Sequence, residues 1–514
     1  MLSKSDLASF RQCPRKLWLE HRRPEAASPA SIDAVMRTRA GAQVGQKARE
    51  RLGPDLLWPR HHDDPEVAAM QALQLLRSAP RAPAVEVPMM RGGLYARADA
   101  LIPTVGGYVL QETKASGFPL KMDKVTPDDP AGHLLDDVAI QAWVFEATGL
   151  VLVRAELNLL DSQWRYPGDD DFSGLFRALD VTATVVERAL QVPDWLSRAH
   201  ATLAGDMPTG RTGKHCKKPH PCAFSDHCQR FDPPGPEHPL SLLPGSGKML
   251  ASRLESTRGY TSLLEPAPEE LTGKQAGLFR RIQHCHRSGQ PHLGPEAART
   301  LASLPYPRYY FDFEGVQLAV PAWPGLRPNA QVTFQWSCHI ERAPGEFEHE
   351  EFLDLSGQDP SLRCIEAMLR VIAVDDEGPI LVYHQQYERD RMRELAQRHP
   401  PHAEALNRYV ARLLDLEDLV RESYYHPAMR GSFSIKRVLP TIAPELDYAA
   451  LGEVHDGAGA QAAYLEAALD AGTSDARRRE IHDNLLKYCR QDTWAMVLVA
   501  RHLQTIGPER GLPG

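Results

Sequence analysis

Two short segments in the C-terminal part of the chain carry acidic residues at spacings that suit metal binding. In YYFDFEG, Asp312 and Glu314 stand two residues apart on an expected strand, so both side chains leave the same face. In KYCRQDTWA, Tyr488 and Asp492 stand four residues apart on an expected helix and lie one above the other. Burying carboxylates in an aromatic strand is costly unless they bind a cation. These residues predict a site for a divalent metal ion.

The same pattern resembles the first and third motifs of the DnaQ-like exonucleases, which have the RNase H fold, and the spacing Y-x3-D resembles their DEDDy branch. The resemblance implies that Asp312, Glu314 and Asp492 bind two metal ions about 4 Å apart, and that Tyr488 orients the attacking water. In PILVYHQQYERDRMREL, Glu388 takes the position of the aspartate in the middle motif of that family. Alternative fourth ligands are Asp390, Asp415 and Asp418.

A second acidic set lies in the N-terminal part of the chain. Asp99 is in YARADALIP, at the expected end of a strand, and Glu112 and Lys114 share one face of the next expected strand, VLQETKA. A hairpin turn at 106–107 would bring Asp99 alongside. Two carboxylates can hold Mg²⁺, and the lysine could orient a bound water or stabilise negative charge that develops on a phosphate.

This second set resembles the PD-(D/E)XK nucleases, in particular the RecB-like exonucleases of AddB and of CRISPR adaptation. Gln141, in QAWVF, matches their Q-x-x-x-Y element, although Phe145 replaces the tyrosine. The relatives usually carry a His or Glu ligand on an early helix, where this chain has Gln43 and Gln46 and no acid before Glu50. We therefore predict that this site, if active, binds metal weakly and needs high Mg²⁺ or Mn²⁺.

Four of the eight cysteines form a separate pattern, C-x5-C-x5-C with one distant partner, which differs from the paired knuckles of zinc ribbons. It resembles the iron–sulfur staple of RecB-like nucleases, and FRQCPRKLWL matches the context of the first ligand. The resemblance implies that the four thiolates hold a [4Fe–4S] cluster, with zinc as the alternative and His215, His220 and His227 as competing ligands. The cysteines are Cys13, Cys216, Cys222 and Cys228. Nearby basic residues that suit phosphate contact are Arg11, Arg15, Lys214 and Lys217.

The elements that must position these residues follow from periodicity and turn signals. In the first part of the chain we expect helices at 3–22, 33–52, 65–77, 133–148 and 172–204, and strands at 84–90, 94–103, 107–116 and 151–160. In the last part we expect strands at 308–316, 331–340 and 379–384, and helices at 388–399, 402–423 and 477–504. This order predicts an α/β protein.

The chain of 514 residues is too long for one ordinary domain. We expect a restriction-endonuclease-like core with an iron–sulfur staple at 1–232, a mostly helical connector at 233–304, and an RNase H-like mixed sheet at 305–514. The order of the two halves resembles one bacterial family with a RecB-like front half and a DnaQ-like back half. That resemblance covers nearly the whole chain.

Composition narrows the class of function. The chain has no apolar run of about 18 residues and its N-terminus has no secretory pattern, so we expect a cytoplasmic protein without membrane contact. The net charge of -8 still permits local basic strips. The resulting hypothesis is a metal-dependent 3'-5' exonuclease that acts on nucleic acid, with DNA ends or single strands as the expected partner, in repair or phage defence. The alternatives are an RNA-processing exonuclease and a nucleic-acid-binding scaffold with one degenerate site.

Overall fold

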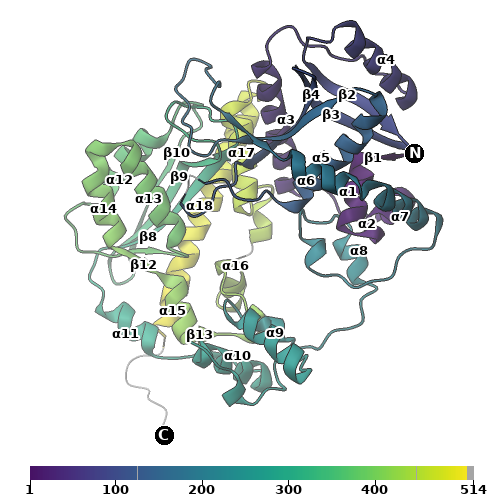
Figure 1. The fold of residues 1–514 in the computed structure, drawn as a ribbon. Coiled ribbons are helices and arrows are strands. Elements are labelled where there is room, and N and C mark those ends of the chain that lie inside the picture. Colours follow the sequence, from purple (N-terminus) through teal and green to yellow (C-terminus); the bar gives the residue numbers. More distant parts are fainter. Residues whose placement is uncertain (124–125, 447, 506–514) are drawn as a thin grey trace. The chain divides into compact units, whose positions relative to one another are not determined.

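The computed structural model describes residues 1–123, 126–446 and 448–505 (Figure 1). They form two compact units, Met1–Pro233 with Leu318–Ala330, and Pro234–Gln317 with Gln331–Gly514. Each unit combines helices with a mixed β-sheet, which confirms the expected α/β class. From Pro234 onward the residues of the expected connector belong to the second unit.

The first unit is built on a six-stranded sheet. Its central order is β1-β3-β4-β5-β6, and β2 pairs with β3. The pair β4·β5 is parallel, whereas β2·β3, β3·β4 and β5·β6 are antiparallel. The strands are β1 (Leu2–Ser3), β2 (Ala84–Arg91), β3 (Leu94–Thr104), β4 (Gly107–Gly117), β5 (Leu152–Leu160) and β6 (Phe176–Asp180).

Eight α-helices accompany this sheet in the described part of the unit, together with short 3-10 turns. Helix α5 is apolar on almost every face and contributes Val138, Ile140 and Val144 to the main core, which explains its central position. The helices are α1 (Lys4–Gln12), α2 (Pro14–Arg22), α3 (Ile32–Arg51), α4 (Pro65–Ser78), α5 (Gly132–Phe145), α6 (Thr182–Ala189), α7 (Val192–Ala204) and α8 (Ser225–Gln229).

Two expected helices of this unit were wrong in part. The helix expected at 3–22 is broken at Cys13, because the residue before a proline avoids helical geometry and Pro14 begins a new helix. The helical stretch expected at 172–204 begins with strand β6, which pairs antiparallel with β5. The segment FRALD has no strong strand preference of its own, so pairing with the sheet edge decided its conformation.

The second unit is built on a five-stranded sheet in the order β10-β9-β8-β11-β12, with β8 in the centre. Strand β11 pairs in parallel with both β8 and β12, while β10 is antiparallel to β9. The strands are β8 (Arg308–Leu318), β9 (Ala330–Ala343), β10 (Glu346–Leu353), β11 (Ile380–Val382) and β12 (Leu413–Asp415). Two further short strands pair with each other, β7 (His292–Leu293) and β13 (Tyr424–Tyr425).

The helices of the second unit include the long C-terminal helix α18, which carries Tyr488 and Asp492 on its buried side. They are α9 (Gly247–Arg258), α10 (Ala276–Ser288), α11 (Glu296–Ser303), α12 (Ser361–Val371), α13 (Gln386–Arg398), α14 (Ala403–Ala411), α15 (Leu416–Ser423), α16 (Ile435–Val438), α17 (Gly457–Leu469) and α18 (Asp475–Leu503). In the described part of the chain, no helix is both long and apolar enough to cross a bilayer.

The helix expected at 402–423 is interrupted by strand β12. Its central residues, Leu413 and Leu414, pair in parallel with Ile380 and Leu381 of β11, and Asp415 then caps the start of α15. The periodicity of leucines fits a buried strand as well as a helix, so the sheet edge decided the outcome. This short strand matters to the site because its last residue reaches the turn that precedes α13.

Candidate functional site

Three carboxylates of the second unit converge at the centre of its sheet. Asp312 and Glu314 leave one face of the central strand β8, and Asp492 comes from α18. One oxygen from each of the three lies within 4.8 Å of the others. Among the described residues, this is the group whose spacing suits a metal ion. The structure thus brings together three of the residues expected from the sequence, and oxygen ligands of this kind suit Mg²⁺ or Mn²⁺.

The electrostatics of this triad favour an added cation. Burial, and then the negative charge of Asp492, raise the pKa of Asp312 well above its ordinary value. Burial and the neighbouring carboxylates likewise raise the pKa of Glu314, and burial raises the pKa of Asp492. Like charges held together away from water oppose one another's ionisation. A divalent cation would remove that penalty, so the site is built from groups that gain from binding metal.

Glu388 lies beside this triad on the first turn of α13. Its side chain is almost fully buried and hydrogen-bonds to Asp312, while its Oε2 has no hydrogen-bond partner among the described residues. Burial and the charge of Asp312 raise the pKa of Glu388 well above the ordinary range. A buried carboxylate oxygen without a partner is expensive and is expected where a ligand completes the shell. Glu388 therefore fits the fourth acidic position.

Two of the alternative fourth ligands have other partners. The Asp415 carboxylate accepts hydrogen bonds from the backbone N–H groups of His384, Gln385 and Glu417, so it fixes the turn that begins α13. His384 has a positive φ of 72°, an uncommon conformation that this turn requires. Asp390 accepts a hydrogen bond from Gln386 one turn earlier on its own helix. The Asp415 contacts position Glu388 by fixing the turn before α13, whereas the side-chain hydrogen bond of Asp390 stays within its own helix and away from the triad.

Two tyrosines and a lysine surround Asp492. The Tyr448 hydroxyl donates a hydrogen bond to Asp492 Oδ1 at 2.6 Å, and Tyr488 also hydrogen-bonds to this carboxylate. The Lys436 ammonium stands 5.2 Å from the ring centroid of Tyr448 and 5.5 Å from that of Tyr488. Its positive charge lowers the pKa of each acid of the triad against the effect of burial. Sequence reasoning missed Tyr448 and Lys436, because neither lies in a recognisable motif.

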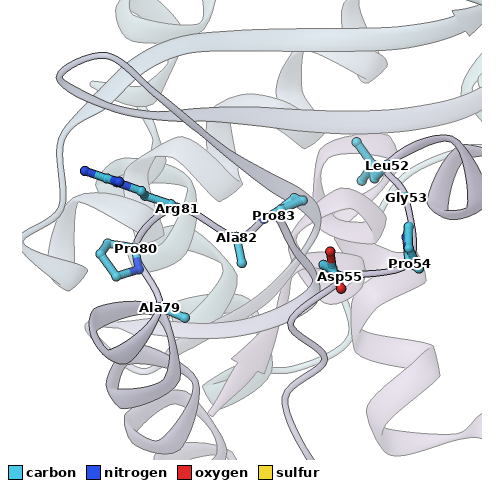
Figure 2. Close-up of a pocket in the computed structure, with 9 residues that line it drawn as sticks. All are labelled: Leu52, Gly53, Pro54, Asp55, Ala79, Pro80, Arg81, Ala82 and Pro83. Carbon is cyan, nitrogen blue, oxygen red and sulfur yellow. The ribbon is translucent and has the colours of Figure 1, made fainter.

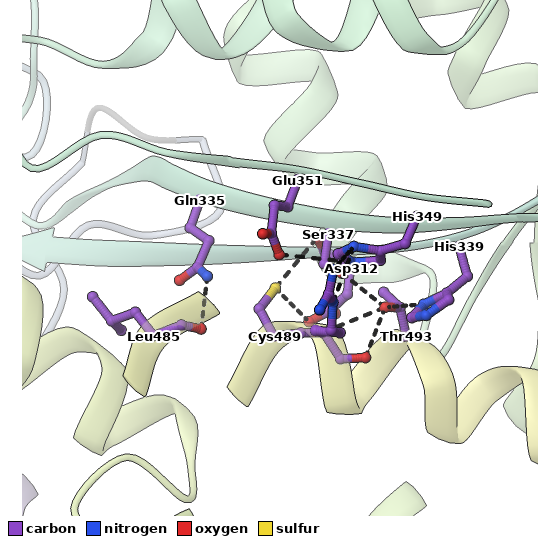
Figure 3. A network of polar contacts seen from close by, with 10 residues as sticks. Asp312, Gln335, Ser337, His339, His349, Glu351, Leu485, Cys489 and Thr493 are labelled. Atoms are coloured by element: carbon purple, nitrogen blue, oxygen red, sulfur yellow. Dashed lines mark hydrogen bonds and ion pairs between the residues drawn. The ribbon is translucent and has the colours of Figure 1, made fainter. Parts of the chain in front are cut away.

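A polar network clamps α18 against the sheet (Figure 3). The Thr493 hydroxyl contacts Ser337 at 2.8 Å and the His339 ring at 2.8 Å, and Gln335 donates to the carbonyl of Leu485. Cys489 Sγ approaches Asp312 Oδ2 at 3.9 Å. These contacts flank Asp492 on both sides along the helix, so they fix the register in which α18 presents its carboxylate to β8.

In the first unit, Asp99, Glu112, Lys114 and Gln141 also come together. Asp99 lies inside β3 rather than at its end, and its Oδ2 accepts a hydrogen bond from the backbone N–H of Thr113 at 2.9 Å. Glu112 is buried on β4, where Lys114 donates to its Oε1 at 2.8 Å. Gln141 Nε2, from α5, donates to the other oxygen of Glu112 at 2.7 Å.

Two residues that sequence reasoning missed complete this set. Lys4, the first residue of α1, places its ammonium 2.8 Å from Glu112 Oε1. Asp137, one turn before Gln141 on α5, lies 2.5 Å from the Lys114 ammonium and 3.8 Å from that of Lys4. The only advance signal for Asp137 was its position four residues before Gln141 on an expected helix. Nothing in the sequence connects Lys4 to β4.

The charges of this set oppose one another. Burial would raise the pKa of Glu112, but the ammonium groups of Lys4 and Lys114 outweigh it and lower that pKa to about 2. Burial and the charge of Glu112 raise the pKa of Asp99 to about 7. Burial would lower the pKa of Lys114, yet Glu112 and Asp137 raise it above its ordinary value. A basic lysine beside two carboxylates can hold a phosphate or a developing oxyanion.

The early helix α3 supplies no additional acid to this set. Glu50 is exposed and bonds to Lys47 at 2.9 Å and to Gln46 at 2.8 Å, both on its own helix. Gln43 is exposed as well. Phe145 is buried against Tyr108, with ring centroids 6.3 Å apart, so the missing hydroxyl is replaced by an apolar edge contact. Asp137 is the acidic residue that joins Asp99 and Glu112 here, but among the described residues these three carboxylates do not meet the 4.8 Å spacing of the triad in the second unit.

All four cysteines of the first unit line one pocket of about 350 Å³. Cys13 stands at the break between α1 and α2, and the three others follow α7 across 13 residues of loop and short helix. The thiols meet although more than 200 residues separate Cys13 from the others. No three of these sulfurs, among the described residues, meet the 4.8 Å spacing of the acidic triad.

Hydrogen bonds hold the walls of this pocket. Gln12 Nε2 donates to the carbonyls of His215 at 2.9 Å and His220 at 2.8 Å, and Arg15 donates to the carbonyl of Pro208. Arg15 is buried and also hydrogen-bonds to Cys228, and Arg11 pairs with an acid of α5. Of the four basic residues expected to contact phosphate, Arg11, Lys214 and Lys217 are exposed and Arg15 is buried.

A further pocket of about 730 Å³ lies between the loops that follow α3 and α4 (Figure 2). Prolines and alanines make up most of its lining, and Asp55 and Arg81 are its charged residues. One carboxylate and one guanidinium make neither a metal site nor a nucleophile with its base. We assign it no chemistry.

The comparisons with known proteins give a family and a relative without a described function. Residues 309–434 match the sequence model of a family described as a domain of unknown function, DUF2779. The matched region contains Asp312, Glu314 and Glu388 and ends before Tyr448 and α18. An uncharacterized protein of Ureaplasma parvum, UU173, is 23% identical over 235 residues, which are 42% of this chain and 34% of that protein. The chain thus spans about a third of the length of that relative.

Proposed function

We propose that this protein is a metal-dependent nuclease whose main active site is the triad Asp312, Glu314 and Asp492, extended by Glu388. The observation that carries the proposal is the convergence of three carboxylate oxygens within 4.8 Å, from one partly buried and two buried groups whose pKa values are all raised. Such an arrangement is costly to fold and gains from a divalent cation. Groups with this chemistry commonly serve phosphoryl transfer.

The order of the strands in the sheet supports the hypothesis that the second unit has an RNase H-like fold of the DnaQ type. The acids lie on the central strand of β10-β9-β8-β11-β12, and the helix that supplies Asp492 also supplies Tyr488. Bound metal would lower the pKa of a water and neutralise charge on the scissile phosphate. In this chain, Asp312 and Glu314 would bind the cation, Tyr488 would orient the attacking water, and Lys436 would face the phosphate. Cleavage of a terminal nucleotide, as in a 3'-5' exonuclease, is the activity we expect.

For the first unit we propose a second, weaker nuclease site and a [4Fe–4S] cluster. Asp99, Glu112, Lys114 and Gln141 are joined by direct contacts, and Asp137 adds an acid. Four thiols around one zinc ion would lie only about 3.8 Å apart, whereas no three of these sulfurs, among the described residues, lie within 4.8 Å of one another. That spread suits a cluster of several irons, held by Cys13, Cys216, Cys222 and Cys228.

The test is a cleavage assay with Mn²⁺ or Mg²⁺ on labelled single- and double-stranded DNA and RNA. We expect Asp312→Ala to lower the rate at least about a hundredfold, the loss associated with a disrupted metal site. Asp390→Asn is the matched control, because it removes a carboxylate of α13 that bonds only within its helix. Undiminished cleavage by Asp312→Ala would refute the assignment of the main site.

The four substrates separate the remaining alternatives. Degradation of DNA from its ends supports the expected partner, and preference for RNA would make the protein an RNA-processing exonuclease, since this fold class serves both. Binding without cleavage under every condition would favour a nucleic-acid-binding scaffold. The 3' and 5' ends are labelled in separate reactions, so the polarity is read from which label is released first.

A further inference from the structure

Lys4 is the feature of the first unit that the proposed function does not use. Its ammonium contacts Glu112 Oε1 at 2.8 Å and lies 3.8 Å from Asp137, while Lys114 binds the same two carboxylates. Two ammonium groups therefore face the two acids, and this part of the set is neutral by charge counting. Asp99 is the remaining carboxylate.

The position of Lys4 is fixed by local structure on both sides. Leu2 and Ser3 form strand β1, which pairs in parallel with the start of β3, the strand that carries Asp99. Ser3 then caps α1 through a reciprocal capping box with Asp6. The chain thus enters the helix directly beside the acidic set, and the first helical residue is the lysine.

The Lys4 side chain can nevertheless leave the carboxylates. It retains 19% exposure, and a lysine has a flexible four-carbon stem. A nucleic-acid phosphate brings a negative charge that attracts an ammonium group, whereas Glu112 is already shared between Lys4 and Lys114. If the ammonium moves to a phosphate, Glu112 and Asp137 regain negative charge at the place where a divalent cation would bind.

We propose that Lys4 is a built-in counter-cation that makes metal binding by Asp99, Glu112 and Asp137 depend on nucleic acid. This inference rests on the proposed nuclease function of the first unit. Without nucleic acid, Lys4 neutralises the site and excludes Mg²⁺ or Mn²⁺. With a phosphate in place, the lysine pairs with the backbone of the nucleic acid and the cation enters. The device would prevent a half-assembled site from holding metal.

The test measures Mn²⁺ binding rather than cleavage. The parent is the full chain with Asp312→Ala and Asp492→Ala, which removes the triad of the second unit. Free Mn²⁺ is measured by electron paramagnetic resonance, with and without a phosphorothioate-protected DNA single strand. We expect DNA to tighten Mn²⁺ binding at least about tenfold, within the usual range of coupling between ligands. Lys4→Met should bind at least about tenfold more tightly without DNA and gain little from it.

Two controls isolate the effect. Lys47→Met removes another ion-paired lysine of the first unit, which contacts Glu50 on α3, and should behave like the parent. The substitution Glu112→Gln, added to the parent and to Lys4→Met, removes the central carboxylate of the site. The Mn²⁺ that these variants still bind is the background held by DNA and by other groups. A thermal unfolding curve shows whether Lys4→Met is folded, and Lys4→Gln replaces it if it is not. The DNA dependence of Mn²⁺ binding in the parent tests the proposal without any substitution at position 4.

The outcomes distinguish the inference from the function on which it rests. If the parent and Lys4→Met bind Mn²⁺ equally well without DNA, Lys4 does not control the site, although the metal site itself stands. If neither protein binds Mn²⁺ above the Glu112→Gln background with or without DNA, the proposed metal site of the first unit is wrong and the inference fails with it.

Discussion

At the scale of single residues, Asp492 illustrates how this protein holds charge away from water. It receives hydrogen bonds from Tyr448 and Tyr488 and stands near the Lys436 ammonium, yet burial still raises its pKa. Hydrogen bonds to the charged form and a nearby cation offset only part of the desolvation penalty. A bound metal ion would relieve the part of the desolvation penalty that these neighbours leave uncompensated. Each of these neighbours should therefore change the affinity for metal.

The first prediction concerns the hydroxyl of Tyr448. Tyr448→Phe removes the hydrogen bond that lowers the pKa of Asp492, so that pKa should rise further. Protons would then compete better with metal, and the acid limb of the pH–activity profile should move up by about one unit, or about tenfold in rate on that limb. Tyr464→Phe is the control, because the hydroxyl of Tyr464 is buried without a hydrogen bond to any residue that the structure describes. An unchanged profile in Tyr448→Phe would contradict this role.

The second prediction concerns the stability of the metal-free protein. The raised pKa of Asp312 means that the folded state binds its proton more tightly than the unfolded chain. This contribution is present at low pH and is lost as pH rises through the folded pKa. In EDTA, Asp312→Asn should therefore unfold at least about 2 °C above the wild type at pH 8, with a smaller difference at pH 5.

Mn²⁺ should reverse that order at pH 8, because it stabilises the wild type by binding its folded state. Asp390→Asn, measured in parallel by differential scanning fluorimetry, should follow the wild type under both conditions. If Asp312→Asn is less stable than the wild type in EDTA at pH 8, the charge of Asp312 does not destabilise the metal-free protein. The prediction is then wrong.

At the scale of elements, α1 links the two polar features of the first unit. Lys4 begins this helix in the acidic set, and Cys13 ends it in the cysteine pocket. Nine residues of helix are about 13 Å long, so a rigid element joins the two places. Gln12 and Arg15 bond to the loop that carries the other cysteines, which anchors this end of the helix.

The third prediction concerns those cysteines. Protein purified without oxygen should be brown, with broad absorbance near about 400 nm, as thiolate-ligated iron–sulfur centres have. Cys216→Ala should lose the colour and lower the melting temperature of the first unit, because the proposed cluster would tie α1 to the loop after α7. Cys364→Ala, which changes a core thiol of the second unit, should keep the colour. A colourless protein with one zinc per chain would favour the zinc alternative.

At the scale of the whole molecule, two units each have a core and a polar set of their own. The acids of β8 and α18 make all their described contacts within the second unit, and the set around Glu112 makes its contacts within the first. Sites without shared partners usually contribute independently to a measured free energy. The two proposed activities should therefore be separable by substitution.

The fourth prediction is that separation. Asp312→Ala should leave a slow cleavage that requires Mn²⁺ or high Mg²⁺ and disappears when Lys114→Ala is added. Lys114→Ala alone should leave most of the activity, since it touches only the weaker site. Loss of all cleavage in Lys114→Ala alone would show that the two activities are not separable and that all cleavage depends on Lys114.

Several elements and short-range groupings were determined by the sequence itself. Asp312 with Glu314, and Glu112 with Lys114, share a face because residues two apart on a strand must do so. Tyr488 and Asp492 share a face of α18 for the corresponding reason in a helix. The break at Cys13 was also available to sequence reasoning through Pro14. These features depend on backbone geometry within a few residues.

The tertiary structure alone decided which distant residues complete each site. Lys4 and Asp137 reach Glu112, and Tyr448 reaches Asp492, across separations at which no periodicity or spacing carries information. Strands β6 and β12 likewise form because a sheet edge offers unpaired backbone groups, although their sequences fit helices. Such contacts arise when packing within each core brings segments together that are remote in the sequence. The charges of the side chains that meet there determine the pKa values of the site.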